Sequence, residues 1–147
     1  MNKSLTKQLL LKNYLLKQNP KNSFDVGHDT FKADIIIVIP CYDEPDVINT
    51  IKNIRECERP DANIAIFVVI NSAIKTNLDI IAYNRETYLN LREYDKKNKD
   101  SDFTIRALIV ESLPNKFFGV GLARKIGMDL AIEHFYNLGH RKIGMIK

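Results

Sequence analysis

Five consecutive β-branched residues, Ile35 to Ile39, restrict the fold of this chain more than any other feature of its sequence. Such residues lose side-chain freedom in a helix and pack well on a pleated sheet, so the run predicts a strand. Because every position is apolar, both faces of the strand are expected to be buried, as in a parallel sheet covered by helices. Pro40 cannot donate to a β-ladder and is predicted to end the strand. The segment Asp34–Asp46 should therefore run from a buried strand through a turn into a helix, with Pro45 near its first turn.

The alternation of strand and helix continues along the chain. Strands are predicted at Ile64–Ile70 and Thr104–Val110, and helices at about Asn77–Tyr94 and at Gly119–Asn137. Lys142–Lys147 has the pattern of the beginning of a fourth strand.

Strand–helix repeats of this spacing predict an α/β fold. We expect a Rossmann-like, three-layer arrangement with a mostly parallel sheet and right-handed crossovers, preceded by an N-terminal helix. The α/β domain is assigned to residues 34–147, and residues 1–33 are assigned to a basic helix and linker. Gly119, Ala123 and Gly127, each four residues apart, form a flat strip on the last helix that permits close approach to a sheet or a ligand.

The N-terminal residues carry the excess charge. Residues 1–33 hold six lysines and two aspartates, which accounts for the whole net charge of +4. The remainder balances, so no basic face for nucleic acid is expected. Asn2–Gln18 is predicted to be helical, with leucines 5, 9 and 16 on one side and leucines 11 and 15 on another. Two interpretations stay open: a helix packed on the domain or on another segment, and a basic helix in weak contact with a membrane surface.

Cysteine content and hydropathy bear on the compartment. Cys41 and Cys57 are the only cysteines, and both are interpreted as free thiols in a reducing cytoplasm. No apolar run approaches the ~20 residues that a membrane-spanning helix needs. The expected location is cytoplasmic, with peripheral membrane contact left open.

Ligands of open α/β sheets bind outside the carboxyl ends of the strands. That rule selects the turn after the first strand and the polar turn after the second. Tyr42 can offer a ring face to a flat base, and Glu44 can accept hydrogen bonds from ribose hydroxyls. Asn71 can bond a base edge, and Arg124 has the forked donors that suit a diphosphate. Tyr42 as a plain packing residue and Arg124 as a surface ion-pair partner remain alternatives.

Two segments carry a family resemblance. Ile37-Val38-Ile39-Pro40-Cys41-Tyr42-Asp43-Glu44 resembles the opening motif of family 2 glycosyltransferases of the GT-A fold, in which an apolar strand precedes Pro, any residue, Tyr, Asn or Asp, and Glu. Gly121-Leu122-Ala123-Arg124-Lys125-Ile126-Gly127 resembles a later motif, in which Gly and apolar residues precede Ala-Arg-Asn and a small residue. The resemblance covers roughly residues 34–147 and implies the nucleotide-sugar-binding part of an incomplete GT-A fold.

The resemblance also implies roles for individual residues. Tyr42 would stack on the nucleotide base, which the backbone of Pro40, Cys41 and Tyr42 would hold. Glu44 would lie near the ribose, and Arg124 near the base or phosphate. Asn71 stands where the family usually has an acidic residue, so a preference for uracil is not implied.

The resemblance implies a divalent cation, Mg²⁺ or Mn²⁺, held by an acid-x-acid motif after the fourth strand. The sequence stops where that strand begins, so no catalytic residue or metal ligand is assigned to it. We expect the N-terminal part of an enzyme that binds a nucleotide diphosphate sugar and is inactive without a missing C-terminal portion. The alternative is a non-catalytic nucleotide-binding or assembly module, completed by a partner or by self-association.

Other candidate sites are weaker. Asp100-Ser101-Asp102 matches acid-x-acid but precedes the third strand, so a solvated loop is favoured over a metal site. Gly119-Val120-Gly121 lacks the third glycine of a dinucleotide-binding fingerprint and does not directly follow a strand, as that fingerprint requires. Cys41 has no evident histidine partner and is interpreted as a buried packing residue rather than a nucleophile. His134 and His140 are interpreted as surface residues rather than metal ligands.

Overall fold

The computed structural model describes residues 3–18, 31–140 and 142–146 of the 147-residue chain. In chain order, the elements are α1 (Lys3–Gln18), β1 (Ile35–Cys41), α2 (Val47–Glu56), β2 (Ile64–Ala73), α3 (Leu78–Lys97), β3 (Phe103–Leu113) and α4 (Val120–Asn137). Within these ranges the strands form one open, fully parallel sheet in the order β1-β2-β3. The α/β fold and the N-terminal helix predicted from the sequence are confirmed.

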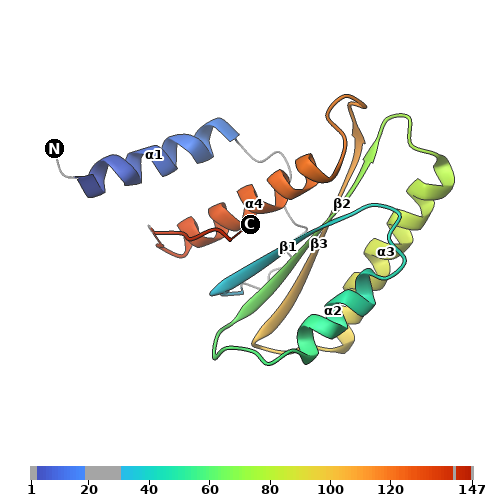
Figure 1. Ribbon diagram of the computed structural model, residues 1–147, viewed down its shortest axis with the longest axis horizontal. Helices are drawn as coiled ribbons and strands as arrows, with labels where there is room; N and C mark the ends of the chain where they lie inside the picture. Colours follow the sequence, from blue (N-terminus) through green and yellow to red (C-terminus); the bar gives the residue numbers. More distant parts are fainter. Residues whose placement is uncertain (1–2, 19–30, 141, 147) are drawn as a thin grey trace.

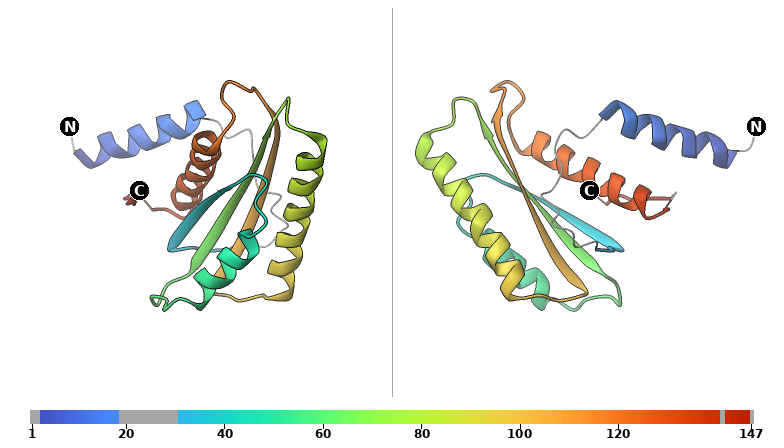
Figure 2. Two further views of the ribbon diagram at one scale, coloured as in Figure 1. Left: turned by 45° about the vertical axis from the view of Figure 1, so that its right-hand side comes forward. Right: turned by 180° about the vertical axis from the view of Figure 1, so that it is seen from behind.

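Helices cover both faces of the sheet. Figure 1 shows α2 and α3 on one side and α4 on the other, and α1 lies beyond α4. The views in Figure 2 show the same layers from other directions. Parallel neighbours need a crossover connection, and α2 provides it between β1 and β2, as α3 does between β2 and β3.

The central strand β2 is buried along its whole length, which explains why its sequence contains no charged residue. All ten of its residues are buried. One face of β2 packs with α2 and α3 through Ile66, Val68 and Ile70, and the other packs with α4 through Phe67 and Val69. The apolar side chains on alternate positions therefore enter two separate cores, as the unbroken pattern predicted. At roughly 25 cal/mol for each Å² of apolar surface removed from water, this double burial is the main stabilising contribution of β2.

The edge strand β1 differs from its prediction at one end. Its sequence run was predicted to stop at Pro40, but the strand continues to Cys41, and Pro40 lies opposite Val69 in the register with β2. Proline is compatible with an edge strand wherever its nitrogen points away from the paired strand. The prediction that Pro40 ends the strand is therefore wrong by one residue.

The predicted fourth strand is not formed. Residues 142–146 have no regular structure, and Lys147 lies outside the described part of the chain. A strand needs a hydrogen-bonded ladder, and this short segment contains Gly144, which has no side chain to pack and costs backbone entropy in a strand. The segment instead lines a groove beside β1.

The last residues of the predicted linker belong to the folded domain, whereas residues 19–30 lie outside the described ranges. Ala33 is buried, and the Phe31 ring meets Phe67 edge-on with 6.0 Å between centroids. Phe31 also stacks on the His134 ring at 4.5 Å. The apolar contacts of the domain therefore begin a few residues before the expected boundary at residue 34.

The small-residue strip of α4 is used for close packing against the sheet. Ala123 is fully buried and Gly127 is also buried. A Cβ atom added to Gly127 would overlap Cγ1 of Val38 and lie 3.0 Å from Cγ2 of Val69. Gly119 is the exception, because it precedes the helix as its N-cap residue, with φ 143°. The predicted close approach of the helix to the sheet is thus confirmed at Ala123 and Gly127.

Candidate functional site

The carboxyl ends of the three strands lie at one edge of the sheet, because the strands are parallel. The turn after β1 and the end of β2 meet there with the loop that leads from β3 into α4. Two residues near this edge have unusual backbone geometry: Asp43, in the turn after β1, has φ 47°, and Ser112, near the end of β3, has φ 58°. Positive φ values in residues other than glycine require support from neighbouring structure.

The turn after β1 is supported by α3. The backbone N–H of Asp43 donates to Oδ1 of Asn84 over 3.0 Å. Asn84 is only 2% exposed, and its Nδ2 has no hydrogen-bond partner in the part of the chain that is described. A buried side chain therefore fixes the left-handed residue that follows Tyr42. Sequence reasoning missed this contact, although an asparagine on the inward face of a long helix was a visible signal.

Tyr42 lies on that turn with 40% of its surface exposed. Its ring meets Phe118 edge-to-face, with centroids 5.0 Å apart and an interplanar angle of 64°. Edge-to-face contact orients an aromatic ring without covering the whole of its face. Tyr42 is thus a partly open aromatic surface held between the turn after β1 and the loop before α4.

Cys41 and Glu44 lie on either side of Tyr42 in the sequence, and their environments differ: Cys41 is buried and Glu44 is exposed. Oε1 of Glu44 accepts from the N–H of Asp46 over 3.0 Å, which stabilises the entry to α2. Cys41 is buried, and burial raises the pKa of its thiol to about 11, with the Glu44 charge as a smaller cause in the same direction. The thiolate is the nucleophilic form of cysteine, so this environment supports a packing role for Cys41.

Asn71 connects the end of β2 to the start of α4. It is 2% exposed, and its Nδ2 donates to the carbonyl oxygen of Gly119 over 3.1 Å. The next residue, Ser72, is 1% exposed, and its Oγ has no hydrogen-bond partner among the residues placed by the structure. Polar groups therefore lie buried at this end of β2, where the prediction placed a base-binding side chain.

Arg124 lies one turn into α4 and is exposed, whereas Asn71 is buried. Arg124 lines a groove of about 950 Å³ beside β1, together with Val38 and Met128. Residues 142–146 form another wall of this groove. The predicted site residues thus fall into a cluster at the carboxyl ends and a single arginine in the neighbouring groove.

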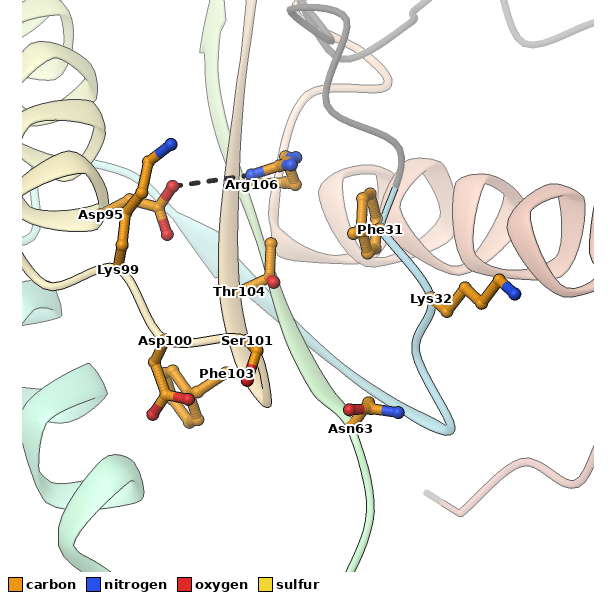
Figure 3. A pocket seen from close by; sticks show the side chains of 10 residues that line it. All are labelled: Phe31, Lys32, Asn63, Asp95, Lys99, Asp100, Ser101, Phe103, Thr104 and Arg106. Atoms are coloured by element: carbon orange, nitrogen blue, oxygen red, sulfur yellow. Dashed lines mark ion pairs between the residues drawn. The ribbon is translucent and has the colours of Figure 1, made fainter.

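A second hollow, of about 460 Å³, lies at the opposite end of the sheet, where β3 begins (Figure 3). The Arg106 guanidinium pairs with Asp95 at 3.6 Å, and Lys32 and Lys99 also line this space. Asp100 accepts from the N–H of Asp102 over 2.9 Å. The acid-x-acid segment therefore lies at the amino end of the sheet, as predicted, and its first carboxylate also pairs with Arg59 at 3.6 Å.

The histidines differ from their predicted surface position in one case. His134 is half-buried, stacks on Phe31 and accepts from the N–H of Ala33 through Nε2 over 3.3 Å. Burial lowers the pKa of its imidazole, and the charge of His140 acts in the same direction. His140 is exposed. The prediction of a surface residue is thus wrong for His134, because the linker end covers it.

Across residues 3–18, 31–140 and 142–146, no group of three or more histidine, cysteine, aspartate or glutamate side chains is placed to hold a metal ion. The residues described thus do not fit the divalent cation that the family resemblance implies. No helix in these ranges is long and apolar enough to cross a membrane.

Comparisons with known proteins identified no relative. No protein-family model matches the chain, and neither a curated protein nor a solved structure does so.

Proposed function

We propose that residues 34–147 are the nucleotide-sugar-binding part of a family 2 glycosyltransferase with a Rossmann-like GT-A fold. The reaction of the whole enzyme would transfer a sugar from a nucleotide diphosphate donor to an acceptor. The observation that carries the proposal is the position of Tyr42. It stands partly exposed at the carboxyl end of β1, on a turn that the buried Asn84 fixes. Ligands of parallel α/β sheets bind at this end.

Each candidate residue has a proposed role at the base, the ribose or the diphosphate. The Tyr42 ring stacks on the base, and the backbone of Pro40, Cys41 and Tyr42 holds the base edge. Glu44 uses one oxygen on the turn and has further lone pairs for ribose hydroxyls. The proposed role of Asn71 is to accept from the base edge through its carbonyl oxygen, while its amide nitrogen donates to the carbonyl oxygen of Gly119.

Arg124, in the neighbouring groove, is the proposed contact for the diphosphate. A guanidinium pairs with a diphosphate through two parallel hydrogen bonds, and its long side chain extends from an exposed position on α4. The groove that Arg124 lines also contains Lys142, which adds to the attraction for a phosphate, and Asp34, which opposes it.

In the complete enzyme, Mg²⁺ or Mn²⁺ would neutralise the leaving diphosphate, with ligands outside the residues described. No catalytic step is assigned to the present residues, and their proposed action is binding and orientation. The proposed location is the cytoplasm, where the thiols of Cys41 and Cys57 stay reduced.

A second candidate function is a non-catalytic assembly module, and one observation favours it. Among the residues that the structure describes, β1 pairs on one side only, and Ile36 and Val38 line the open groove of about 950 Å³. An unpaired apolar strand edge is a template for pairing with another chain, including a second copy. Sedimentation velocity over a range of concentrations tests this function: a stable dimer supports it, and a monomer throughout contradicts it.

Calorimetric titration of the chain with UDP, GDP, CDP and ADP tests the binding proposal. We expect weak binding of at least one of them, and a loss of about 1–3 kcal/mol in Tyr42→Ala, as for other base–aromatic stacks. Tyr42→Phe keeps the ring and should keep the affinity. Leu89→Ala, an exposed position on α3, controls for general surface effects. Equal affinity of wild type and Tyr42→Ala would contradict the stacking role.

A further inference from the structure

Helix α1 has two apolar sides, and only one of them is covered. Leu11 and Leu15, four residues apart, are half-buried, and α1 is in contact with α4. Leu9 and Leu16, seven residues apart and therefore on one face, are 59% and 68% exposed. The two-sided leucine pattern of the sequence thus corresponds to an inner contact and an outer stripe.

The inner contact fixes which side of α1 faces away from the domain. The Tyr14 hydroxyl donates to Oδ1 of Asp129 on α4 over 2.5 Å. The Lys125 ammonium donates to the other oxygen of the same carboxylate, also over 2.5 Å. The hydrogen bond from Tyr14 to Asp129 raises the pKa of the phenol to about 12, and the phenol is protonated at neutral pH. The outer stripe is consequently presented to the surroundings.

The charge of α1 indicates what the outer stripe contacts. Its sixteen residues include lysines at positions 3, 7, 12 and 17 and no aspartate or glutamate. Lys12 and Lys17 are exposed beside the stripe. A second copy of this helix would bring like charges together, which opposes association. An anionic lipid surface attracts the lysines and accepts the leucines.

A second apolar and basic patch supports the same partner. Ile74 and Phe117 are 65% and 62% exposed on the loops at the carboxyl ends of the sheet. The adjacent residue of each is a lysine, and the Lys116 ammonium lies 5.6 Å from the centre of the Phe117 ring. The views in Figures 1 and 2 place these two loops and α1 along the same side of the molecule.

We propose that α1 and the two loops dock the protein on an anionic phospholipid bilayer. In this arrangement α1 lies in the plane of the interface, the outer leucines enter the headgroup–acyl boundary, and the lysines contact anionic headgroups. The Tyr14–Asp129 hydrogen bond connects the bound helix to α4. This inference does not depend on the proposed nucleotide site.

Vesicle sedimentation tests the proposal with the full chain. One set of vesicles contains phosphatidylcholine alone, and the other contains phosphatidylcholine with about one third phosphatidylglycerol. We expect binding to the anionic vesicles only, and weaker binding as sodium chloride rises. Absence of binding to anionic vesicles at low salt overturns the proposal.

Two paired variants separate docking from general effects. Lys12→Gln with Lys17→Gln should reduce the partition coefficient roughly 25-fold, at about fivefold for each lysine near an anionic surface. Leu9→Ala with Leu16→Ala should reduce it by roughly tenfold, because the outer stripe loses apolar volume. Each pair changes exposed side chains only, and circular dichroism verifies that the helix content is retained.

The matched controls are on the far face of the sheet. Lys52→Gln with Lys96→Gln removes the same charge from α2 and α3, and Leu89→Ala removes an equally exposed leucine. These controls should bind like the wild type. If the controls lose as much binding as the α1 variants, the attraction is nonspecific and the proposal fails. A dimer in solution that Leu9→Ala with Leu16→Ala abolishes would assign the stripe to a protein contact instead.

Discussion

Asn84 Oδ1 accepts the backbone N–H of Asp43 over 3.0 Å, and this contact joins the inward face of α3 to the turn after β1. The two residues are 41 positions apart in the sequence. The contact stabilises a left-handed residue, Asp43, directly after Tyr42. A residue buried in the helix layer thus sets the backbone geometry next to Tyr42, the aromatic candidate for ligand contact.

Asn84→Ala should destabilise the protein by about 1–3 kcal/mol, because the N–H of Asp43 loses its partner in a buried place. Urea unfolding followed by circular dichroism measures the change. Asn90→Ala, on the exposed face of the same helix, is the matched control and should stay within about 0.5 kcal/mol of wild type. Equal stability of the two variants would show that the contact contributes little.

Asp43 itself allows a test of the turn. Asp43→Gly should be neutral or stabilising, because glycine adopts φ 47° without steric cost. Asp43→Val should destabilise by about 1–2 kcal/mol, since a β-branched residue is strained in the left-handed region. Thermal unfolding of the two variants compares them directly. A valine variant as stable as the glycine variant would mean that the turn adopts another conformation.

The same substitution at two glycines of α4 should have opposite effects. Gly127→Ala should destabilise by about 1–3 kcal/mol, because its Cβ would overlap the Val38 side chain and push the helix from the sheet. Gly121→Ala should stabilise by about 0.5–1 kcal/mol, since nothing lies within 4 Å of the added atom and alanine favours helix. Chemical denaturation of both variants gives the signs, and two changes of the same sign would contradict the packing described.

The low pKa of His134 predicts a pH dependence of stability. Its ordinary pKa of 6.5 applies in the unfolded chain, and burial lowers the pKa in the folded protein. The unfolded state therefore binds the proton more readily, so stability is full above about pH 6.5 and falls as the pH decreases toward the folded pKa. His134→Phe keeps an aromatic ring against Phe31 and should flatten this fall between about pH 7.5 and 5.

The ion-paired carboxylate of Glu111 affects stability at a lower pH than His134 does. The pKa of Glu111 is lowered by its hydrogen bonds to Arg85, so its contribution is lost only below the ordinary glutamate value of 4.5. Urea titrations of wild type and His134→Phe at several pH values supply the comparison. The assignment of the effect to His134 fails if the two proteins lose stability in parallel.

The sequence predicted the elements well where one local pattern was enough. The run Ile35–Ile39 and the similar run in β2 identified buried parallel strands, because apolar residues on both faces leave few other solutions. Residues 142–146 show the limit of this reasoning. Their pattern is apolar enough for a strand, but strand formation depends on a ladder that local sequence does not encode.

The candidate site was predictable only in part. The position of Tyr42 follows from the order of strand, proline and helix along the chain. Tyr42 contacts Phe118, and the next residue, Asp43, bonds to Asn84. Both contacts join segments that are remote in sequence, so no local pattern could predict them. Arg124 was identified from its residue type and its position in a motif. Its location in the groove beside β1 depends on how α4 packs against the sheet, which the motif does not encode.

Backbone NMR with a nucleoside diphosphate tests the central claim most directly. Amide shifts recorded during titration with UDP or GDP locate the ligand without assuming any role for a single side chain. We predict the largest changes at residues 41–44 and 71–73, at the carboxyl ends of β1 and β2, with little change at residues 99–102 at the amino end. Changes confined to the amino end, or none at saturating nucleotide, would contradict the proposed site.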